Sequence, residues 1–189
     1  MKNVSPSYFK HQFLIAMPHM HDQNFAQTLT YIVEHNANGA MGLVINRPQS
    51  LSLADILEQL RPEMSPPVRC QHIPIHVGGP VQTDRGFVLH APAGDYTSSI
   101  RLGDLALTTS RDVLQAVAEG SGPVRMLVTL GYAGWGAGQL ENEMAQNAWL
   151  NVSANLHIIF DVPPDERYPA ALKLLGFDPV MLTGDAGHA

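Results

Sequence analysis

The spacing of apolar residues along the chain predicts short strands interleaved with helices. Short apolar runs between turn-forming residues are typical of buried strands, and the alternation at Ile73, Ile75 and Val77 is typical of a half-buried strand. The predicted strands cover residues 13–17, 40–45, 73–77, 86–90, 98–102, 105–108, 124–130 and 156–160. Because residues 73–77 and 86–90 flank a turn-rich connection, we expect them to pair as antiparallel neighbours.

Helical spacing and capping residues predict several helices. Asp22 can cap the first, and the pair Ser52 and Asp55 forms a capping box at the start of the second. Thr109 or Ser110 can cap the third. The predicted helices cover about residues 23–35, 53–61, 111–119, 138–147 and 165–175.

The order of these elements predicts an α+β fold. Strands and helices do not alternate strictly and one hairpin is expected, so the sheet should be mixed and strongly curved, with helices flanking it. The 189 residues contain no internal repeat, low-complexity segment or clear linker, and they suffice to bury a core without a disulfide or a metal. We therefore expect a single domain over residues 1–189, with a core at about 8–180 and short flexible termini.

Composition and charge narrow the function. The formal net charge is −6, and the 11 Lys and Arg residues are scattered. Nucleic-acid affinity comes largely from basic side chains that neutralise phosphates, so direct DNA binding is not expected. The N-terminus lacks the apolar core of a signal peptide, the apolar runs are too short to span a membrane, and Cys70 is the single cysteine. These features predict a cytoplasmic protein without membrane contact.

The glycine-rich segment 131–143 is the most informative motif. A strand, a glycine loop and a helix in this order can bind phosphate at the helix N-terminus. The segment lacks the Lys and Ser/Thr of a P-loop, and Glu141 and Glu143 would repel a phosphate. A close-packed turn anchored by Trp135 is the favoured interpretation, and nucleotide binding is the alternative.

Polar residues at predicted strand ends supply further candidates. Arg47 follows a strand, where it could bind a carboxylate or phosphate or could hold backbone carbonyls, and the chemistry favours neither. His90 ends a strand and follows Asp84 and Arg85, so it could share a polar cleft with them. A structural role for His90 is the favoured interpretation.

The histidines and the cysteine indicate no metal site and no cofactor. The nine histidines are scattered and lack a metal-binding spacing. Cys70 lies between Arg69 and His72, and nearby positive charge would lower the pKa of its thiol. Cys70 is therefore a candidate reactive thiol, although an unreactive loop thiol is the favoured interpretation.

Several sequence blocks together resemble a known family. They are FLIAMP at 13–18, EH at 34–35, GAMGLVINRP at 39–48, GGPVQTDRGFVLH at 78–90, GYAGWGAGQLENE at 131–143 and NAW at 147–149. In these blocks, which cover nearly the whole chain in order, the sequence is similar to the AlgH/YqgE family of bacterial proteins, most of all to its AlgH branch. The resemblance implies a compact α+β domain with a barrel-like sheet. It also implies that the protein is a regulator of exopolysaccharide (alginate) gene transcription. It brings no catalytic residues with it.

The polar, loop-placed residues of these blocks form the predicted site. It comprises Asn46, Arg47, Asp84, Arg85, His90, Trp135, Gln139 and Glu141. We expect these parts of the chain to converge on one face, with Arg47 or Arg85 beside the carboxylate of Asp84 or Glu141.

Three hypotheses for function remain. The first is a regulatory protein that affects transcription indirectly, through a partner protein or a bound metabolite. The alternative is an enzyme that acts on a small polar or phosphorylated molecule with an Arg/Asp/His cleft. Direct DNA binding ranks last, because the chain has neither a helix-turn-helix pattern nor the required charge.

Overall fold

The structure is a computed structural model that describes residues 8–177. Its strands are β1 (Gln12–Ala16), β2 (Leu29–Asn36), β3 (Gly39–Val44), β4 (Pro48–Ser52), β5 (Pro74–Val77), β6 (Val81–Ala91), β7 (Ser99–Leu102), β8 (Leu105–Thr108), β9 (Arg125–Gly136) and β10 (Trp149–Ser153). In this part of the chain they form a ten-stranded sheet in the order β10-β1-β2-β3-β9-β6-β8-β7, and β4 joins it through β5, which pairs with β9.

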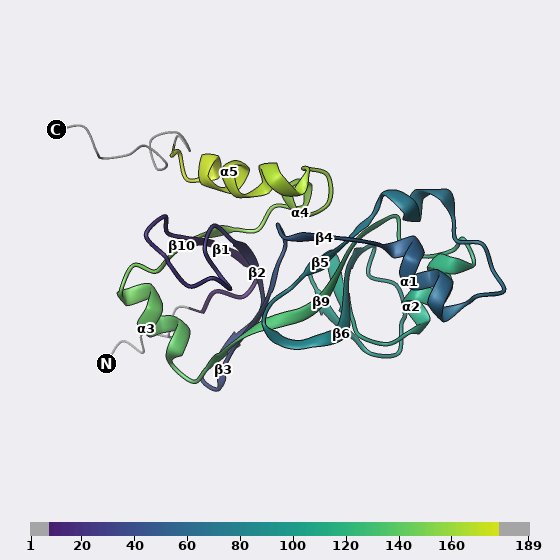
Figure 1. The fold of residues 1–189 in the computed structure, drawn as a ribbon. Coiled ribbons are helices and arrows are strands. Elements are labelled where there is room, and N and C mark those ends of the chain that lie inside the picture. Colours follow the sequence, from purple (N-terminus) through teal and green to yellow (C-terminus); the bar gives the residue numbers. More distant parts are fainter. Residues whose placement is uncertain (1–7, 178–189) are drawn as a thin grey trace.

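Helices flank the sheet on both sides. They are α1 (Leu53–Leu60), α2 (Asp112–Ala118), α3 (Gln139–Ala145), α4 (Leu156–Phe160), α5 (Pro164–Leu174) and the 3-10 helix η1 (Val68–His72). Figure 1 shows α1 and α2 beside β5 and β6, whereas α3 and α5 lie around β1, β2 and β10. The predicted α+β class, with a strongly curved half-barrel sheet, is confirmed. Within residues 8–177, no helix is long and apolar enough to cross a membrane.

The curvature of the sheet follows from β9, which belongs to both of its halves. Residues 125–130 of β9 pair with β6, and residues 128–130 also pair in parallel with β5. Residues 133–136 pair instead with β3. β9 therefore leads from the half that carries α1 and α2 to the half that carries α3 and α5 (Figure 1).

Alternate side chains of the strands enter different cores. Phe13 and Ile15 of β1 join a central core with residues of α4 and α5, whereas Leu14 and Ala16 join a core under α3. Likewise, Leu89 of β6 enters the central core and the neighbouring Val88 packs under α1 and α2. Strands buried on both faces read as continuous apolar runs, which is why several of them are short and uninterrupted in the sequence.

The helix predicted at residues 23–35 is wrong. Asp22 caps only a turn, in which its carboxylate accepts the N–H of Asn24 at 2.8 Å, and the chain then continues as β2. Residues 29–33 are all buried because β2 is covered on both faces. A fully buried segment satisfies helical spacing and strand spacing equally, and the β-branched residues Thr30, Ile32 and Val33 favour the strand.

The C-terminal region differs from the prediction in the opposite sense. Residues 156–160, predicted as a strand, form the short helix α4, since the side chain of Asn155 accepts the N–H of Ile158 at 3.1 Å and caps it. The strand of this region is β10, which the apolar pattern did not predict and which pairs with β1. β4 was also missed. The helix predicted at 165–175 is confirmed as α5.

The predicted pairing of residues 73–77 with 86–90 is wrong. Both segments are strands, but β9 lies between them and pairs with β5 in parallel and with β6 antiparallel. The connection at 78–80 crosses β9 instead of forming a hairpin. Gly79 has a φ of +153° there, and a Cβ on it would lie 2.2 Å from the carbonyl carbon of Tyr132. Turn-forming residues thus mark a close crossing of two backbones.

The glycine-rich segment is mostly strand. β9 continues to Gly136, so only residues 137–138 remain as a turn before α3, and the predicted helix near 138–147 is confirmed. The capping box of Ser52 and Asp55 is confirmed at α1. The cap predicted for the next helix is wrong, because α2 begins at Asp112 and the hydroxyl of Ser110 donates to that carboxylate at 2.5 Å.

Candidate functional site

Asn46 and Arg47 hold the turn that precedes β2. The guanidinium of Arg47 donates to the carbonyl oxygens of Asn24 at 2.6 Å, Ala26 at 2.9 Å and Gln23 at 3.0 Å. The side-chain amide of Asn46 accepts the N–H of Leu29 and donates to the carbonyl of Gln27, both at 2.9 Å. Burial lowers the pKa of Arg47, and nearby Asp22 partly opposes this. These contacts support the interpretation of Arg47 as a backbone clamp.

Trp135, Gln139 and Glu141 lie around the start of α3. Gln139 accepts the N–H of Gly136 at 2.9 Å and thereby closes the turn after β9. The ring of Trp135 is 6% exposed and packs 6.0 Å from both Phe25 and Trp149. Trp135 therefore anchors the segment, as expected from the sequence, in a cluster of aromatic rings.

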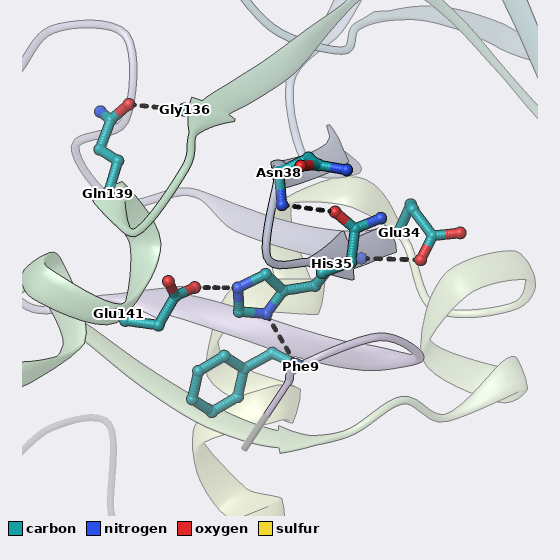
Figure 2. A network of polar contacts seen from close by, with 8 residues as sticks. Phe9, Glu34, His35, Asn38, Gly136, Gln139 and Glu141 are labelled. Carbon is teal, nitrogen blue, oxygen red and sulfur yellow. Dashed lines mark hydrogen bonds and ion pairs between the residues drawn. The ribbon is translucent and has the colours of Figure 1, made fainter. Parts of the chain in front are cut away.

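Glu141 pairs with His35, a residue that the sequence analysis quoted within a family block but did not consider for the site. The His35 side chain is fully buried, and its Nε2 contacts the Glu141 carboxylate (Figure 2). Its Nδ1 accepts the N–H of Phe9 at 2.9 Å, so in the neutral ring Nε2 carries the proton and donates to Glu141. Both nitrogens are occupied, and the pair ties the N-terminal segment to α3.

A hollow lies between α1, α2 and the sheet. Its cavity volume is about 330 Å³, and it brings together residues that are distant in sequence. The apolar surface comes from Ile56 and Leu60 of α1, Leu114 of α2 and Ile75, Val88, Val128 and Leu130 of the sheet. Asp84, Arg85 and Arg111 are polar residues of the lining, and all three side chains are exposed.

An irregularity in β6 positions Asp84 and Arg85 at this hollow. Val81 pairs with Tyr132 and Gly86 pairs with Leu130, so β6 advances five residues while β9 advances two. The extra residues bulge out of the ladder, as expected for a β-bulge. Arg85 donates to the side chain of Gln82 at 3.1 Å, and its guanidinium lies 5.4 Å from the ring centre of Phe87.

His90 lies behind the wall of the hollow. Its Nε2 accepts the hydroxyl of Thr108 at 2.7 Å, and its Nδ1 donates to the carbonyl of Pro92 at 3.1 Å. Thr108 lines the hollow, yet both it and His90 are fully buried. Burial lowers the pKa of His90, against the smaller effect of the Pro92 carbonyl, so the ring is neutral at pH 7. These contacts favour the structural role for His90.

The predicted residues converge only in part. Asp84 and Arg85 line the hollow under α1 and α2, and Arg85 and Trp135 line a second hollow of about 570 Å³. Arg47 lines a separate hollow, and Glu141 faces His35. The expected pairing of an arginine with Asp84 or Glu141 is wrong, because Arg47 binds carbonyls and Arg85 binds an amide. Sequence adjacency to strand ends could not reveal which faces these ends share.

Cys70 does not have the surroundings of a reactive thiol. Its side chain is fully buried in η1, and burial raises its pKa, against a smaller effect of Arg69. The guanidinium of Arg69 donates instead to the carbonyls of Pro123 and Val124, at 3.2 and 3.3 Å. Across residues 8–177, no group of three or more His, Cys, Asp or Glu side chains could hold a metal ion.

The fold and its hollows define a small α+β domain in which a curled half-barrel sheet carries helices on both sides. A family model described as AlgH-like matches residues 13–180. The chain belongs to this AlgH-like family.

Curated relatives are similar to this chain in sequence over all or nearly all of its length. The UPF0301 protein AlgH of Pseudomonas aeruginosa is 62% identical over 189 residues, and a UPF0301 protein of Pseudomonas syringae pv. tomato is 64% identical over 190, each match covering 100% of both chains. A UPF0301 protein of Bordetella petrii is 68% identical and covers 96% of this chain and 90% of its own.

Solved structures give the same result. The solution structure of AlgH from Pseudomonas aeruginosa matches with a TM-score of 0.79 at 63% identity and covers 100% of both chains. A protein from Corynebacterium diphtheriae matches with a TM-score of 0.67 at 19% identity, over 92% of this chain and 89% of that one. The second match shows a shared fold alone.

Proposed function

We propose that the protein is a bacterial regulator that affects transcription of exopolysaccharide genes indirectly, by binding a small metabolite in the hollow under α1 and α2. The observation that carries this proposal is an apolar hollow of about 330 Å³ with two arginines in its lining. Small-molecule sites are commonly concave, mostly apolar and fitted with a few polar groups that orient the ligand.

The lining indicates the chemistry of the ligand. The inner surface is formed by aliphatic side chains, which would bury an apolar group, while Arg85 and Arg111 are exposed enough to reach an acidic group at the opening. Arg85 is held by a bond to one neutral side chain, so forming a bidentate contact with a carboxylate requires little rearrangement. A small acid with an apolar tail fits this arrangement.

Two observations support an indirect effect on transcription. The net charge of −6 opposes the counterion release that drives DNA binding. The hollow is also bounded by two helices, so a ligand there would contact α1, α2 and the bulge of β6 together. A ligand that prefers one arrangement of these elements would shift the population that a partner protein recognises.

The enzyme alternative has less support. Arg47, Arg85 and His90 do not share a cleft, and the Thr108 hydroxyl that His90 contacts is fully buried.

The test is a thermal-shift screen of small organic acids on the full chain, followed by variants. A ligand at one hundred times its Kd stabilises a protein by about 2.7 kcal/mol, which is readily detected. We expect the ligands identified to be acids with apolar tails, and we expect Arg85→Ala to lower their affinity. Arg101 is an exposed arginine of β7 outside the hollow, so Arg101→Ala should leave the affinity unchanged. The proposal fails if no acid binds or if Arg85→Ala leaves every hit unchanged.

The cellular arm uses a variant that fills the hollow. Leu114→Trp should keep the fold and remove ligand binding, because Leu114 is only partly buried at the lining. We expect the transcripts of exopolysaccharide genes to change as in a deletion strain. A folded Leu114→Trp protein that regulates normally would contradict the proposal.

A further inference from the structure

Arg167 of α5 is a buried cation. It is 6% exposed, and its guanidinium connects several parts of the fold. Nε donates to the carbonyl of Val162 at 2.9 Å, and Nη1 contacts the carbonyl of Ile45 at 2.5 Å and Nε2 of His76 at 2.9 Å. Nη2 takes part in none of these bonds. α5 is thus joined to the end of β3 and to β5 by one side chain.

No anion within residues 8–177 balances this charge. The ion pairs of this part of the chain do not include Arg167. Burial lowers the pKa of Arg167 to about 10, so the guanidinium still carries its charge at pH 7. A buried charge without a counterion is costly, and proteins commonly pair it.

His76 adds a neutral polar group beside Arg167. It is 2% exposed, and burial together with Arg167 lowers its pKa to about 4, so the ring is neutral at pH 7. Because Nε2 accepts from Arg167, the proton lies on Nδ1. Nδ1 is buried and lacks a hydrogen-bond partner of normal geometry in the described chain, although the backbone carbonyls of Pro74 and Val128 lie near the ring and partly oppose the lowering of its pKa.

Both side chains line a hollow of about 220 Å³. Its other walls include Phe160, Pro163 and Pro164, and the exposed His72 also lines it. Among residues 8–177, Asp161 is the one acidic residue of the lining, and its carboxylate is held by Arg125 and by His157 at 3.1 Å. The hollow therefore combines one uncompensated cation with walls that are apolar in part.

We propose that this hollow binds a small organic monocarboxylate, whose carboxylate pairs with Arg167. One negative charge balances one guanidinium, and the apolar part of the walls, at Phe160, Pro163 and Pro164, accepts a short hydrocarbon chain. A doubly charged phosphate would bring an unbalanced charge close to the carboxylate of Asp161. At about 30 Å³ for each water-sized group, a cavity volume of 220 Å³ holds roughly seven such groups, which suits an acid of a few carbons.

This site is distinct from the hollow under α1 and α2, so the two proposals stand or fall separately. A carboxylate here would lie against α5, the loop after α4 and β5 together. Its binding would stabilise the attachment of the C-terminal helices to the sheet, since a ligand of the native state alone raises its stability.

The experiment titrates butyrate into the full-length protein at constant ionic strength, with chloride and inorganic phosphate as comparisons. The ¹⁵N shifts of the His76 ring report on the hollow itself. We expect saturable changes with butyrate, none with chloride and weaker ones with phosphate. Absence of a saturable response, or binding of phosphate as tight as that of butyrate, would overturn the proposal.

Variants separate binding from a purely structural role of Arg167. Arg167→Gln should weaken butyrate binding by about thirtyfold or more, as loss of a buried charge partner does. Asp161→Asn should tighten it several-fold because it removes the repelling carboxylate, and a structural clamp gives no such gain. Pro163→Trp, at an exposed wall position, should block binding without touching Arg167. If Arg167→Gln fails to fold, the other two variants decide, and butyrate affinity unchanged in both contradicts the site.

Discussion

Three buried histidines show how the surroundings of a residue decide its role. His35 uses Nε2 for Glu141 and Nδ1 for Phe9, and His90 uses its nitrogens for Thr108 and Pro92. Only His76 keeps a nitrogen without a normal partner in the described chain. The sequence shows nine equivalent histidines, because the contacts that distinguish them come from residues far along the chain.

Arg47 offers a direct test of the clamp interpretation. Arg47→Ala leaves the carbonyls of the turn before β2 without their donors. A bond to a charged group contributes a net stabilisation of about 1.5–3 kcal/mol, but water can replace the donor at the exposed carbonyls of Asn24 and Gln23. We expect the free energy of unfolding to fall by about 2 kcal/mol, which corresponds to a fall in Tm of about 4–8 °C for a domain of this size. Arg85→Ala, whose partner is an exposed amide, is the matched control and should leave Tm nearly unchanged. Equal effects of the two changes would contradict the clamp.

Glu143 of α3 should make stability depend on pH. Burial raises its pKa, the nearby indoles of Trp135 and Trp149 partly oppose this, and Asp22 adds to it. A carboxyl whose folded pKa exceeds its unfolded value contributes stability that is fully present below the unfolded pKa and is lost as the pH rises through the folded pKa. The Tm difference between Glu143→Gln and the wild type should therefore become more positive as pH rises from about 4 to 8.

The difference between the two proteins is the informative quantity. Asp55 and Asp112 have lowered pKa values, owing mainly to hydrogen bonds from Ser52 and Ser110. They therefore stabilise the fold more as pH rises, which is opposite to the effect of Glu143, but they do so equally in the variant and in the wild type. Circular-dichroism melts at a series of pH values measure the difference directly. A constant or falling difference would show that Glu143 is not protonated preferentially in the folded state.

At the scale of elements, backbone crossings shape the sheet more than side chains do. Gly79 lies where the connection after β5 passes β9, with a φ of +153°. Gly79→Ala combines backbone strain of about 1–3 kcal/mol with a clash against Tyr132, so we expect a loss of about 3 kcal/mol or more and a fall in Tm of about 6–12 °C.

Gly86 of β6 is the matched control for this change. Beyond its two chain neighbours, no atom of the described residues lies within 4 Å of the position that a Cβ on Gly86 would take, and its φ is ordinary. Gly86→Ala should be neutral or stabilise by about 0.5–1 kcal/mol, since alanine restricts the unfolded chain more than glycine does. Thermal melts of the two variants side by side measure the contrast, and similar losses in both would argue against a close crossing at Gly79.

At the scale of the whole molecule, the negative net charge disfavours binding to DNA. With a net charge of −6, the chain should not bind promoter DNA specifically at physiological salt. Fluorescence anisotropy with a labelled promoter fragment and a scrambled fragment tests this. We expect no such binding, and sub-micromolar affinity that depends on sequence would refute the indirect mechanism.

The sequence by itself determined the elements whose signal is local. The capping box at α1, the strands β1 and β3, the pair β7 and β8 and the helix α5 all follow from neighbouring residues, as does the α+β class. The polar pair Asp84 and Arg85, between turn residues and a buried strand, is also visible without the fold, and its part in a binding site stays a prediction.

Only the tertiary structure decided what depends on contacts between distant segments. β2 could not be assigned from spacing, since residues 29–33 are all buried and the periodic signal that separates a strand from a helix is lost. The five residues of α4 are too few to show a helical period. β9 begins 34 residues after the end of β6 in the sequence, yet in the sheet it lies between β5 and β6. No local sequence pattern indicates this pairing. Likewise, the pairing of His35 with Glu141 and of Arg167 with His76 spans 106 and 91 residues, so their chemistry exists only once the sheet has closed.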